Sequence, residues 1–239
     1  MRSRKKLLMF GVLLPLLSVG YVQKSAISTQ NSMITRFSDD FTRDTALEPG
    51  WTLSEPNPAS SHKLSGEGLS LTASGRNGGS DYWPLSNSNA TLLLRPLPTS
   101  GDWVATAEFA YDPTDDFSGA GIILTTSANG SKEFHRFEYE RNHFQNSPSR
   151  GVEDFSNIGG GGRLIPFVEK RILLRIAKTG PHYDVSASAD GVTWIPGFGV
   201  RDGAQYSYIG LIVARQPYQP SPNPDPAAVF KTFTLATGE

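Results

Sequence analysis

The sequence predicts an all-β fold made of successive antiparallel strands. Asp102 to Ala110 alternates between apolar and polar side chains, the period of two that marks a half-buried strand. Turn signals such as Pro49-Gly50, Asn129-Gly130 and Asp190-Gly191 recur between short apolar runs. No stretch after the first twenty residues keeps a helical period, so we expect sheets and few helices.

Composition bounds the size and the partners of this fold. The chain has 239 residues, 24 Gly, 17 Pro and no Cys. Its length suits one large all-β domain, which at this size is expected to be stable without disulfides. The net charge of −1 gives no field that would attract nucleic acid or an anionic membrane, so neither partner is expected.

The first twenty residues have the pattern of an export signal. Basic residues between Arg2 and Lys6 precede the apolar run Leu7 to Val19, and Ser18-Val19-Gly20 supplies small residues for cleavage. The alternative is an uncleaved anchor, although the run is shorter than the ~20 residues that a spanning helix needs. We expect residues 1–20 to be a signal peptide and the product to be secreted or periplasmic, without contact to the membrane once the signal is cleaved.

Residues 21–36 are polar and aperiodic and are interpreted as a linker or disordered arm, so the domain is expected to span 37–239. A Gly-, Asn- and Ser-rich loop is predicted from Asn142 to Gly162. The predicted strands are Phe37–Phe41, Trp51–Leu53, Leu69–Thr72, Thr91–Leu94, Asp102–Ala110, Ala120–Thr125, Phe134–Arg141, Arg171–Ile176, Tyr183–Ala187, Val192–Trp194, Tyr208–Ala214 and Val229–Leu235.

The strand Phe134 to Arg141 carries the most chemistry. His135, Phe137 and Tyr139 are predicted to share one face, and the opposite face carries Arg136, Glu138 and Glu140. One side of this sheet therefore presents a row of charge. The four His residues have no metal-ligand spacing, which argues against a metal enzyme.

Eight short motifs in order resemble the concanavalin A-like domain found at the C-terminus of family 43 β-xylosidases and in stand-alone secreted relatives. They are FSDDF (37–41), DYW (81–83), LLLRPLPTSGDWVATAEF (92–109), AGIIL (120–124), LLRI (173–176), SADGVTW (188–194), YIGLIVA (208–214) and FKTF (230–233). The resemblance implies a jelly-roll β-sandwich of two antiparallel sheets, one of them concave. In the xylosidases this domain is an accessory that packs on a catalytic propeller, so a separate glycosidase is a possible partner.

The resemblance also bears on metal. In related sandwiches an acid between the two closing phenylalanines joins an acid near the N-terminus around a structural calcium. Here Lys231 stands between Phe230 and Phe233, and an ammonium group cannot ligate calcium. Although Asp39 and Asp40 remain available, we expect no cofactor and no structural calcium.

Carbohydrate binding is the function that these observations favour. Sugar rings stack on aromatic side chains, and Asp, Glu, Asn and Arg satisfy their hydroxyls. The candidate ligand-binding residues are Tyr82, Trp83, Arg136, Glu138 and Glu140, and the expected partner is an oligo- or polysaccharide, plant-type or another β-glycan. Of the other tryptophans, Trp103 and Trp194 are expected in the core, and Trp51 is ambiguous.

Three other interpretations stay open. Laminarinase-like jelly-roll enzymes place carboxylates at alternate positions of a concave strand, so Glu138 and Glu140 could serve a glycoside hydrolase. The same charges could simply be the solvated face of a strand. The domain could also be structural or mediate interactions without a sugar ligand.

Overall fold

The computed structural model describes residues 34–83, 87–129, 133–142, 149–156, 160–216 and 224–238. The chain divides into two compact units, Met1–Gln30 and Asn31–Glu239, and every described strand lies in the second. Within the described ranges there is no helix, and hence none that could cross a membrane. The predicted signal peptide lies outside these ranges. So does the predicted linker, except for its last three residues, which open the first strand.

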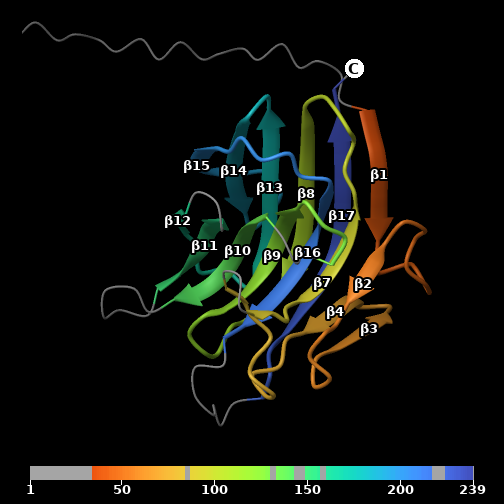
Figure 1. The fold of residues 1–239 in the computed structure, drawn as a ribbon, viewed down its shortest axis with the longest axis vertical. Helices are drawn as coiled ribbons and strands as arrows, with labels where there is room; N and C mark the ends of the chain where they lie inside the picture. The colour runs from red at the N-terminus through yellow and green to blue at the C-terminus, as the bar shows by residue number, and fades with distance from the viewer. Residues whose placement is uncertain are drawn as a thin grey trace, which may run out of the picture. The chain divides into compact units, whose positions relative to one another are not determined.

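An eight-stranded antiparallel sheet forms one layer (Figure 1). Its order is β15-β14-β13-β8-β17-β4-β3, and β1 pairs with β17. The strands are β1 (Ile34–Asp40), β3 (Ser61–Ser65), β4 (Gly68–Thr72), β8 (Trp103–Ala110), β13 (Arg171–Thr179), β14 (His182–Ser188), β15 (Ile195–Arg201) and β17 (Ala227–Thr237).

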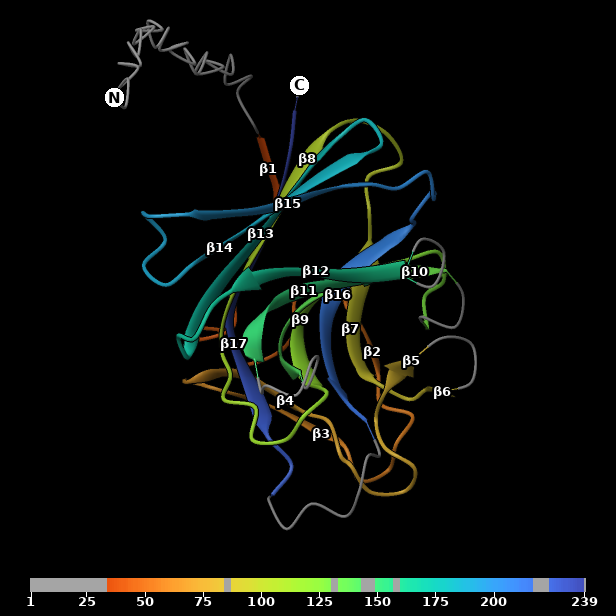
Figure 2. The same ribbon diagram turned by 90° about the vertical axis from the view of Figure 1, so that its left-hand side faces the viewer.

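A seven-stranded antiparallel sheet forms the second layer, in the order β12-β11-β10-β9-β16-β7-β2. Its strands are β2 (Thr52–Ser54), β7 (Thr91–Pro96), β9 (Ser118–Thr125), β10 (Phe134–Asn142), β11 (Ser149–Ser156), β12 (Gly160–Pro166) and β16 (Tyr208–Arg215). The short pair β5 (Tyr82–Trp83) and β6 (Asn87–Ser88) lies on the outer side of this sheet, toward which β7 and β16 are concave (Figure 2).

The core fills the space between the two sheets. The alternation in β8 is observed as predicted, because Trp103, Ala105, Ala107 and Phe109 are buried between half-exposed neighbours. The seven-stranded sheet meets them with side chains such as Phe137. Burying an aromatic or aliphatic side chain of this size contributes about 1.5–3 kcal/mol. The predicted all-β jelly-roll sandwich of two antiparallel sheets is confirmed.

Three expectations are wrong. The predicted loop from Asn142 to Gly162 contains β11 and the first three residues of β12. Each face of β11 mixes polar and apolar residues, with Val152 and Asp154 buried on its inner side, so its sequence shows no alternation. Val192–Trp194 is not a strand but part of the connection from β14 to β15, and Trp194 is only half-buried there rather than a core residue.

Candidate functional site

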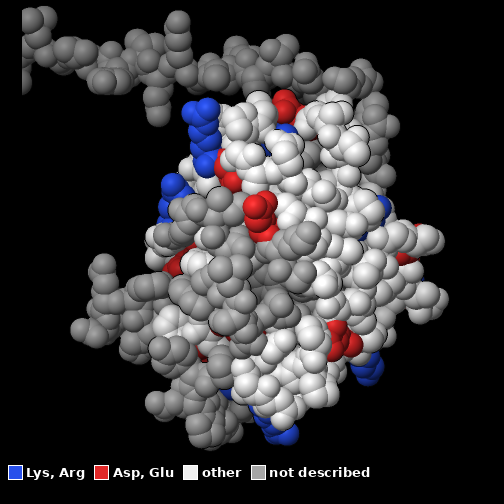
Figure 3. Space-filling model, viewed as in Figure 1, with Lys and Arg blue, Asp and Glu red and all other residues white. Residues whose placement is uncertain are grey.

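The charged row (Arg136, Glu138 and Glu140) lies on the outer face of the seven-stranded sheet, as the alternation predicts. These side chains are not solvated, since Arg136 is 6%, Glu138 2% and Glu140 9% exposed. Figure 3, which views the molecule as in Figure 1, shows the described charged side chains on this side of the molecule as separate patches. The interpretation of the row as a solvated sheet face is therefore wrong.

Glycines on the neighbouring strand β9 make room for the two acids. In the antiparallel register Glu138 lies opposite Gly121, and Glu140 lies opposite Gly119. A Cβ atom at Gly119 would stand 3.2 Å from Glu138 Cδ and 3.2 Å from Glu140 Cβ, tighter than ordinary contact. The side chains of Glu138 and Glu140 therefore lie over a part of β9, the glycine floor, that carries no side chains.

The part of this outer face next to the charged row is apolar. A second cluster of buried residues lies on β7, β9, β10 and β16, apart from the main core, and the half-buried Phe155 of β11 packs against it. Its fully or almost fully buried members are Ala90, Leu92, Leu94, Ile123, Phe134, Ile212 and Ala214. The outer face therefore joins an apolar half to a charged half.

Arg136 is the centre of the charged half. Its Nη1 lies 3.0 Å from Glu138 Oε2 and 3.7 Å from Asp81 Oδ1, and its Cζ lies 5.1 Å from the centre of the Phe155 ring. Burial by itself would lower the pKa of Arg136, but the surrounding carboxylates, Glu138 first, raise it. The guanidinium therefore stays charged.

The acid cluster, defined as the charged row with Asp81 and Glu153, sets four carboxyl groups against this one guanidinium. Burial raises the pKa of Glu138 to about 7, although Arg136 opposes the shift. Burial also raises the pKa of Glu140 well above its ordinary value, and a hydrogen bond with Glu153 adds to the shift. Two carboxyl groups can share a hydrogen bond only when one holds a proton, so the cluster is partly protonated at neutral pH.

The acid cluster is also incompletely bonded. Glu138 Oε1 and Arg136 Nε are buried and find no hydrogen-bond partner within the part of the chain that the structure describes. A buried donor or acceptor that lacks a partner costs about 1–3 kcal/mol, so each such atom needs an explanation.

Asp81 reaches Arg136 from the connection between β4 and β7. Asn57 fixes this connection by donating from its side-chain amide to the carbonyls of Arg76 (2.8 Å) and Gly79 (2.9 Å). A two-way backbone bridge joins Ser80 to Arg215 of β16. Tyr82 and Trp83 follow Asp81 directly, so their backbone is brought to the charged row, but their side chains lie outside the described residues.

Several of these residues carry no signal in the local sequence pattern. Glu153 lies in the stretch expected to be a loop, and Asp81 comes from a distant connection. Arg215 is 4% exposed, and its guanidinium holds Asp225 and also Asp115, at 2.5 Å from Asp115 Oδ2. One signal could have identified Arg215. It is a basic residue at the end of the otherwise apolar strand β16.

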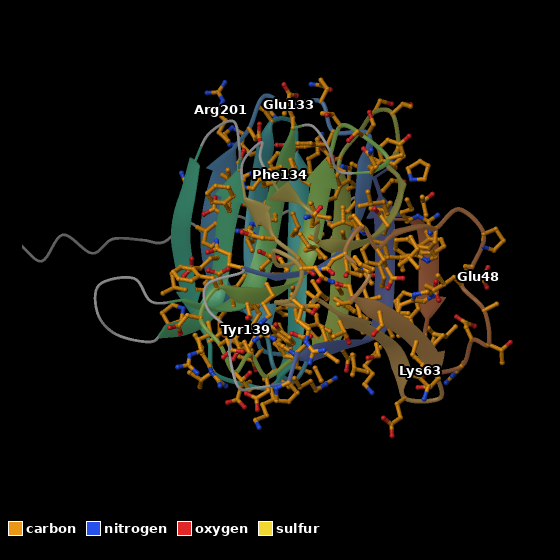
Figure 4. The ribbon with its side chains drawn as sticks, turned by 60° about the horizontal axis from the view of Figure 1, so that its bottom comes forward. Glu48, Lys63, Glu133, Phe134, Tyr139 and Arg201 are labelled. Atoms are coloured by element: carbon orange, nitrogen blue, oxygen red, sulfur yellow. The ribbon has the colours of Figure 1, made fainter. Side chains whose placement is uncertain are left out.

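The inner face of β10 carries a different ionisable group, the histidine cluster (His135, Asp154, Asp202 and Tyr206). The buried imidazole has Nδ1 3.0 Å from Asp202 Oδ2 and Nε2 3.3 Å from Asp154 Oδ2. Tyr206 donates its hydroxyl to Asp202 Oδ2 at 2.5 Å. Figure 4 labels Phe134, the neighbour of His135, near the molecular edge that also holds Glu133 and Arg201.

Opposite charges set the protonation of the histidine cluster. Burial alone would lower the pKa of His135, but the two carboxylates raise it. Burial opposes ionisation of Asp202, yet hydrogen bonds from His135 and Tyr206 lower its pKa to about 2, and the pKa of Asp154 is lowered as well. The cluster therefore holds an imidazolium between two carboxylates.

The residues near the predicted calcium position do not fit that ion. Lys231 donates to the carbonyl oxygen of Glu67. Asp40 is bonded locally to Thr42 and lies 3.1 Å from Arg43 Nε. Asp39 accepts from the Trp51 indole at 2.7 Å, and burial raises its pKa to about 6. Because these side chains are already engaged by other groups and an ammonium cannot ligate calcium, the absence of calcium stays a prediction with a physical reason.

Comparison with known proteins shows the fold and no closer relationship. No protein-family model matches the sequence, and no curated protein matches it either. Solved structures do match. The GH43 protein BlXynB from Bacillus licheniformis superimposes with a TM-score of 0.62 at 15% identity, over 85% of this chain and 39% of that chain.

Two other matches are of the same kind. Xylan β-1,4-xylosidase from Bacillus halodurans C-125 gives a TM-score of 0.56 at 15% identity, over 83% of this chain and 38% of that chain. The exoplasmic/lumenal domain of VIP36, in a form bound to Ca²⁺ and Man2, gives 0.57 at 12% identity, over 84% and 87%. This chain thus spans about two fifths of the GH43 chains, and at these identities the likeness concerns the concanavalin A-like fold alone.

Proposed function

We propose that this chain is a carbohydrate-binding β-sandwich whose seven-stranded sheet takes a neutral β-glycan on its outer, concave face. The observation that carries the proposal is the incompletely bonded acid cluster above the glycine floor of β9. The names of the matched proteins support it, because they include a xylosidase and a domain with bound Man2.

The chemistry of the acid cluster suits a neutral sugar. Arg136 supplies fixed donors, and the carboxyl groups accept or donate according to their protonation, as vicinal hydroxyls require. The excess of acids over Arg136 disfavours phosphates and uronic acids, which carry negative charge. The backbone position of Tyr82 and Trp83 beside Asp81 would bring aromatic rings to the same place, where a pyranose face could stack.

The test is binding of neutral hexaoses of xylose, glucose and mannose at pH 8, where Glu138 is largely ionised. Glu138→Gln should weaken binding by tenfold or more, about 1.5–3 kcal/mol for a lost charged hydrogen bond. Glu108→Gln is the matched control, because Glu108 is bonded to Arg171 on the other sheet. If none of the hexaoses binds, the domain is structural or an interaction module, for instance for a separate glycosidase.

A glycoside hydrolase is the second candidate, favoured by the pKa of Glu138 near 7, as a general acid requires. Glu138 and Glu140 are alternate residues of one strand face, so their Cα atoms stand about 7 Å apart. Hydrolysis of a β-glycan that Glu138→Gln or Glu140→Gln reduces by orders of magnitude, while binding persists, would establish this activity. We favour binding, because the fold does not transfer activity.

We also propose that the domain is exported and that cleavage follows about Gly20. Intact-mass measurement of protein from the culture medium or periplasm should give a chain that lacks residues 1–20. Full-length protein that stays in the membrane fraction would instead establish the uncleaved anchor.

A further inference from the structure

A groove of about 500 Å³ lies on the outer face of the eight-stranded sheet, on the opposite side of the sandwich from the acid cluster. Its floor follows from the register. Val104 of β8, Ala177 of β13, Asp184 of β14 and Gly199 of β15 stand opposite one another in a row across the four strands. Because Ala177 and Gly199 are small, the sheet surface is low here, and Phe198 lies at the groove where β15 bulges.

Arg175 forms one wall and is held in place before any ligand arrives. Its guanidinium carbon lies 4.0 Å from the Trp194 ring centre, and its Nε donates to the Ser186 hydroxyl at 3.2 Å. Among the described residues its two terminal nitrogens make no hydrogen bond or ion pair. They are therefore preorganised donors that still need acceptors.

Asp184 supplies a hydrogen-bond acceptor to the same groove. It is exposed, and no side chain in the described ranges forms an ion pair with it, whereas Glu108 on the same face is paired with Arg171 at 2.8 Å. The groove thus combines one donor group, one acceptor group, an aromatic ring and an apolar floor, with no net charge. An anion would be repelled by Asp184 and a cation by Arg175, so this combination suits a neutral polyhydroxylated ligand.

We propose that this groove is a second saccharide site, which takes a short segment of a neutral glycan with its hydroxyls between Arg175 and Asp184 and its apolar face toward Phe198. Its volume lies within the 300–1,000 Å³ of ordinary ligand pockets. The site is independent of the acid cluster, since the two lie on opposite faces.

The experiment follows the backbone amide signals of Ala177, Asp184 and Gly199 in the full chain while xylohexaose, cellohexaose or mannohexaose is added. We expect saturable shifts with at least one probe. Arg175→Gln and Asp184→Asn should each weaken that binding by tenfold or more. Asp184 has no bond to lose, so its variant should fold normally. Arg171→Gln, on the same strand and face, is the matched control and should leave binding unchanged.

Glu138→Gln separates this site from the proposed concave-face site, because it should not alter the shifts of Ala177 and Gly199. Absence of saturable shifts up to about 10 mM probe, a weak affinity by any standard, would overturn the proposal. Tighter binding of inorganic phosphate than of any hexaose would also overturn it, since the groove would then be an anion site.

Discussion

The two faces of β10 bury ionisable side chains in opposite ways. On the inner face, His135 stands between two carboxylates, both imidazole nitrogens are bonded, and the pKa shifts of His135, Asp154 and Asp202 all favour the charged forms. On the outer face, Arg136 stands among four carboxyl groups, two atoms have no partner in the described structure, and the pKa of Glu138 rises to about 7. Burial alone therefore does not mark a functional site. Imbalance of charge and of hydrogen bonds does.

The largest effect should come from His135→Leu. This change leaves Asp202 without a cation and Asp154 with Arg163 alone, and should destabilise the fold by about 3–5 kcal/mol in urea unfolding. His62→Leu is the control, because His62 is paired with Glu55 at the surface and its loss should cost less than about 1 kcal/mol. A small effect at His135 would mean that the two clusters do not differ as described.

The pH dependence of the destabilisation by His135→Leu follows from the pKa shifts in the histidine cluster. The lowered pKa values of Asp154 and Asp202 add stability above pH ~4 that is lost as pH falls toward 2. The raised pKa of His135 adds stability that is complete below pH ~6.5 and lost as pH rises through its folded pKa. The penalty of His135→Leu should therefore be greatest between these limits. An equal penalty at pH 5 and pH 9 would contradict the assignment of an imidazolium.

The opposite pH dependence of stability is expected for Glu138→Gln. A raised acid pKa favours the fold below its ordinary value of 4.5 and removes that stability as pH rises through about 7. The variant should therefore match wild type at pH 5 and be more stable at pH 8.5 by about 1–3 kcal/mol. Lower stability at pH 8.5 would show that the Arg136–Glu138 pair behaves like the histidine cluster.

A smaller effect should follow from Gly119→Ala, which tests how closely the outer acids pack. The new Cβ would press on Glu138 and Glu140 at 3.2 Å and move them by a few tenths of an ångström, so we expect a loss of about 1 kcal/mol. Gly66→Ala is the control, because nothing lies within 4 Å of its Cβ position. Equal stability of the two variants would indicate that the acids have free space.

The smallest effect concerns Asp39, a third buried acid, whose raised pKa resembles that of Glu138. Because Asp39 is bonded to the Trp51 indole and the neighbouring Asp40 to Thr42 and Arg43, EDTA should leave the melting temperature unchanged. A bound structural ion would instead stabilise the fold by mass action, so a drop of several degrees would disprove this expectation.

Sequence periodicity alone predicts the strands that have one solvent-exposed face or two apolar faces. The alternation of β8, the faces of β10 and the apolar run of β16 all follow from local pattern. The burial of the charged row could not be predicted in this way. It depends on what covers the sheet, including Asp81 from a connection more than fifty residues before β10, and a local pattern carries no information about such a contact.

Only part of the candidate site could be predicted, because contacts between distant segments leave no local pattern in the sequence. Arg136, Glu138 and Glu140 share a face as expected, but Glu153 lay in a stretch whose strand β11 has mixed faces. Trp194 was misassigned because a turn next to a strand resembles the strand in composition. Its ring is half-buried under Arg175, a contact that only the register of β13 and β14 creates.

The position of β17 has a consequence for how the chain reaches its fold. This strand lies inside the eight-stranded sheet, paired with β8 and β4, and it also carries β1, so that Ile34 lies beside Thr237 (Figure 1). Closing a loop of about 200 residues is slow, and the eight-stranded sheet lacks a central strand until β17 is present. The sheet that begins with β1 can therefore be completed only after the chain has been synthesised as far as β17.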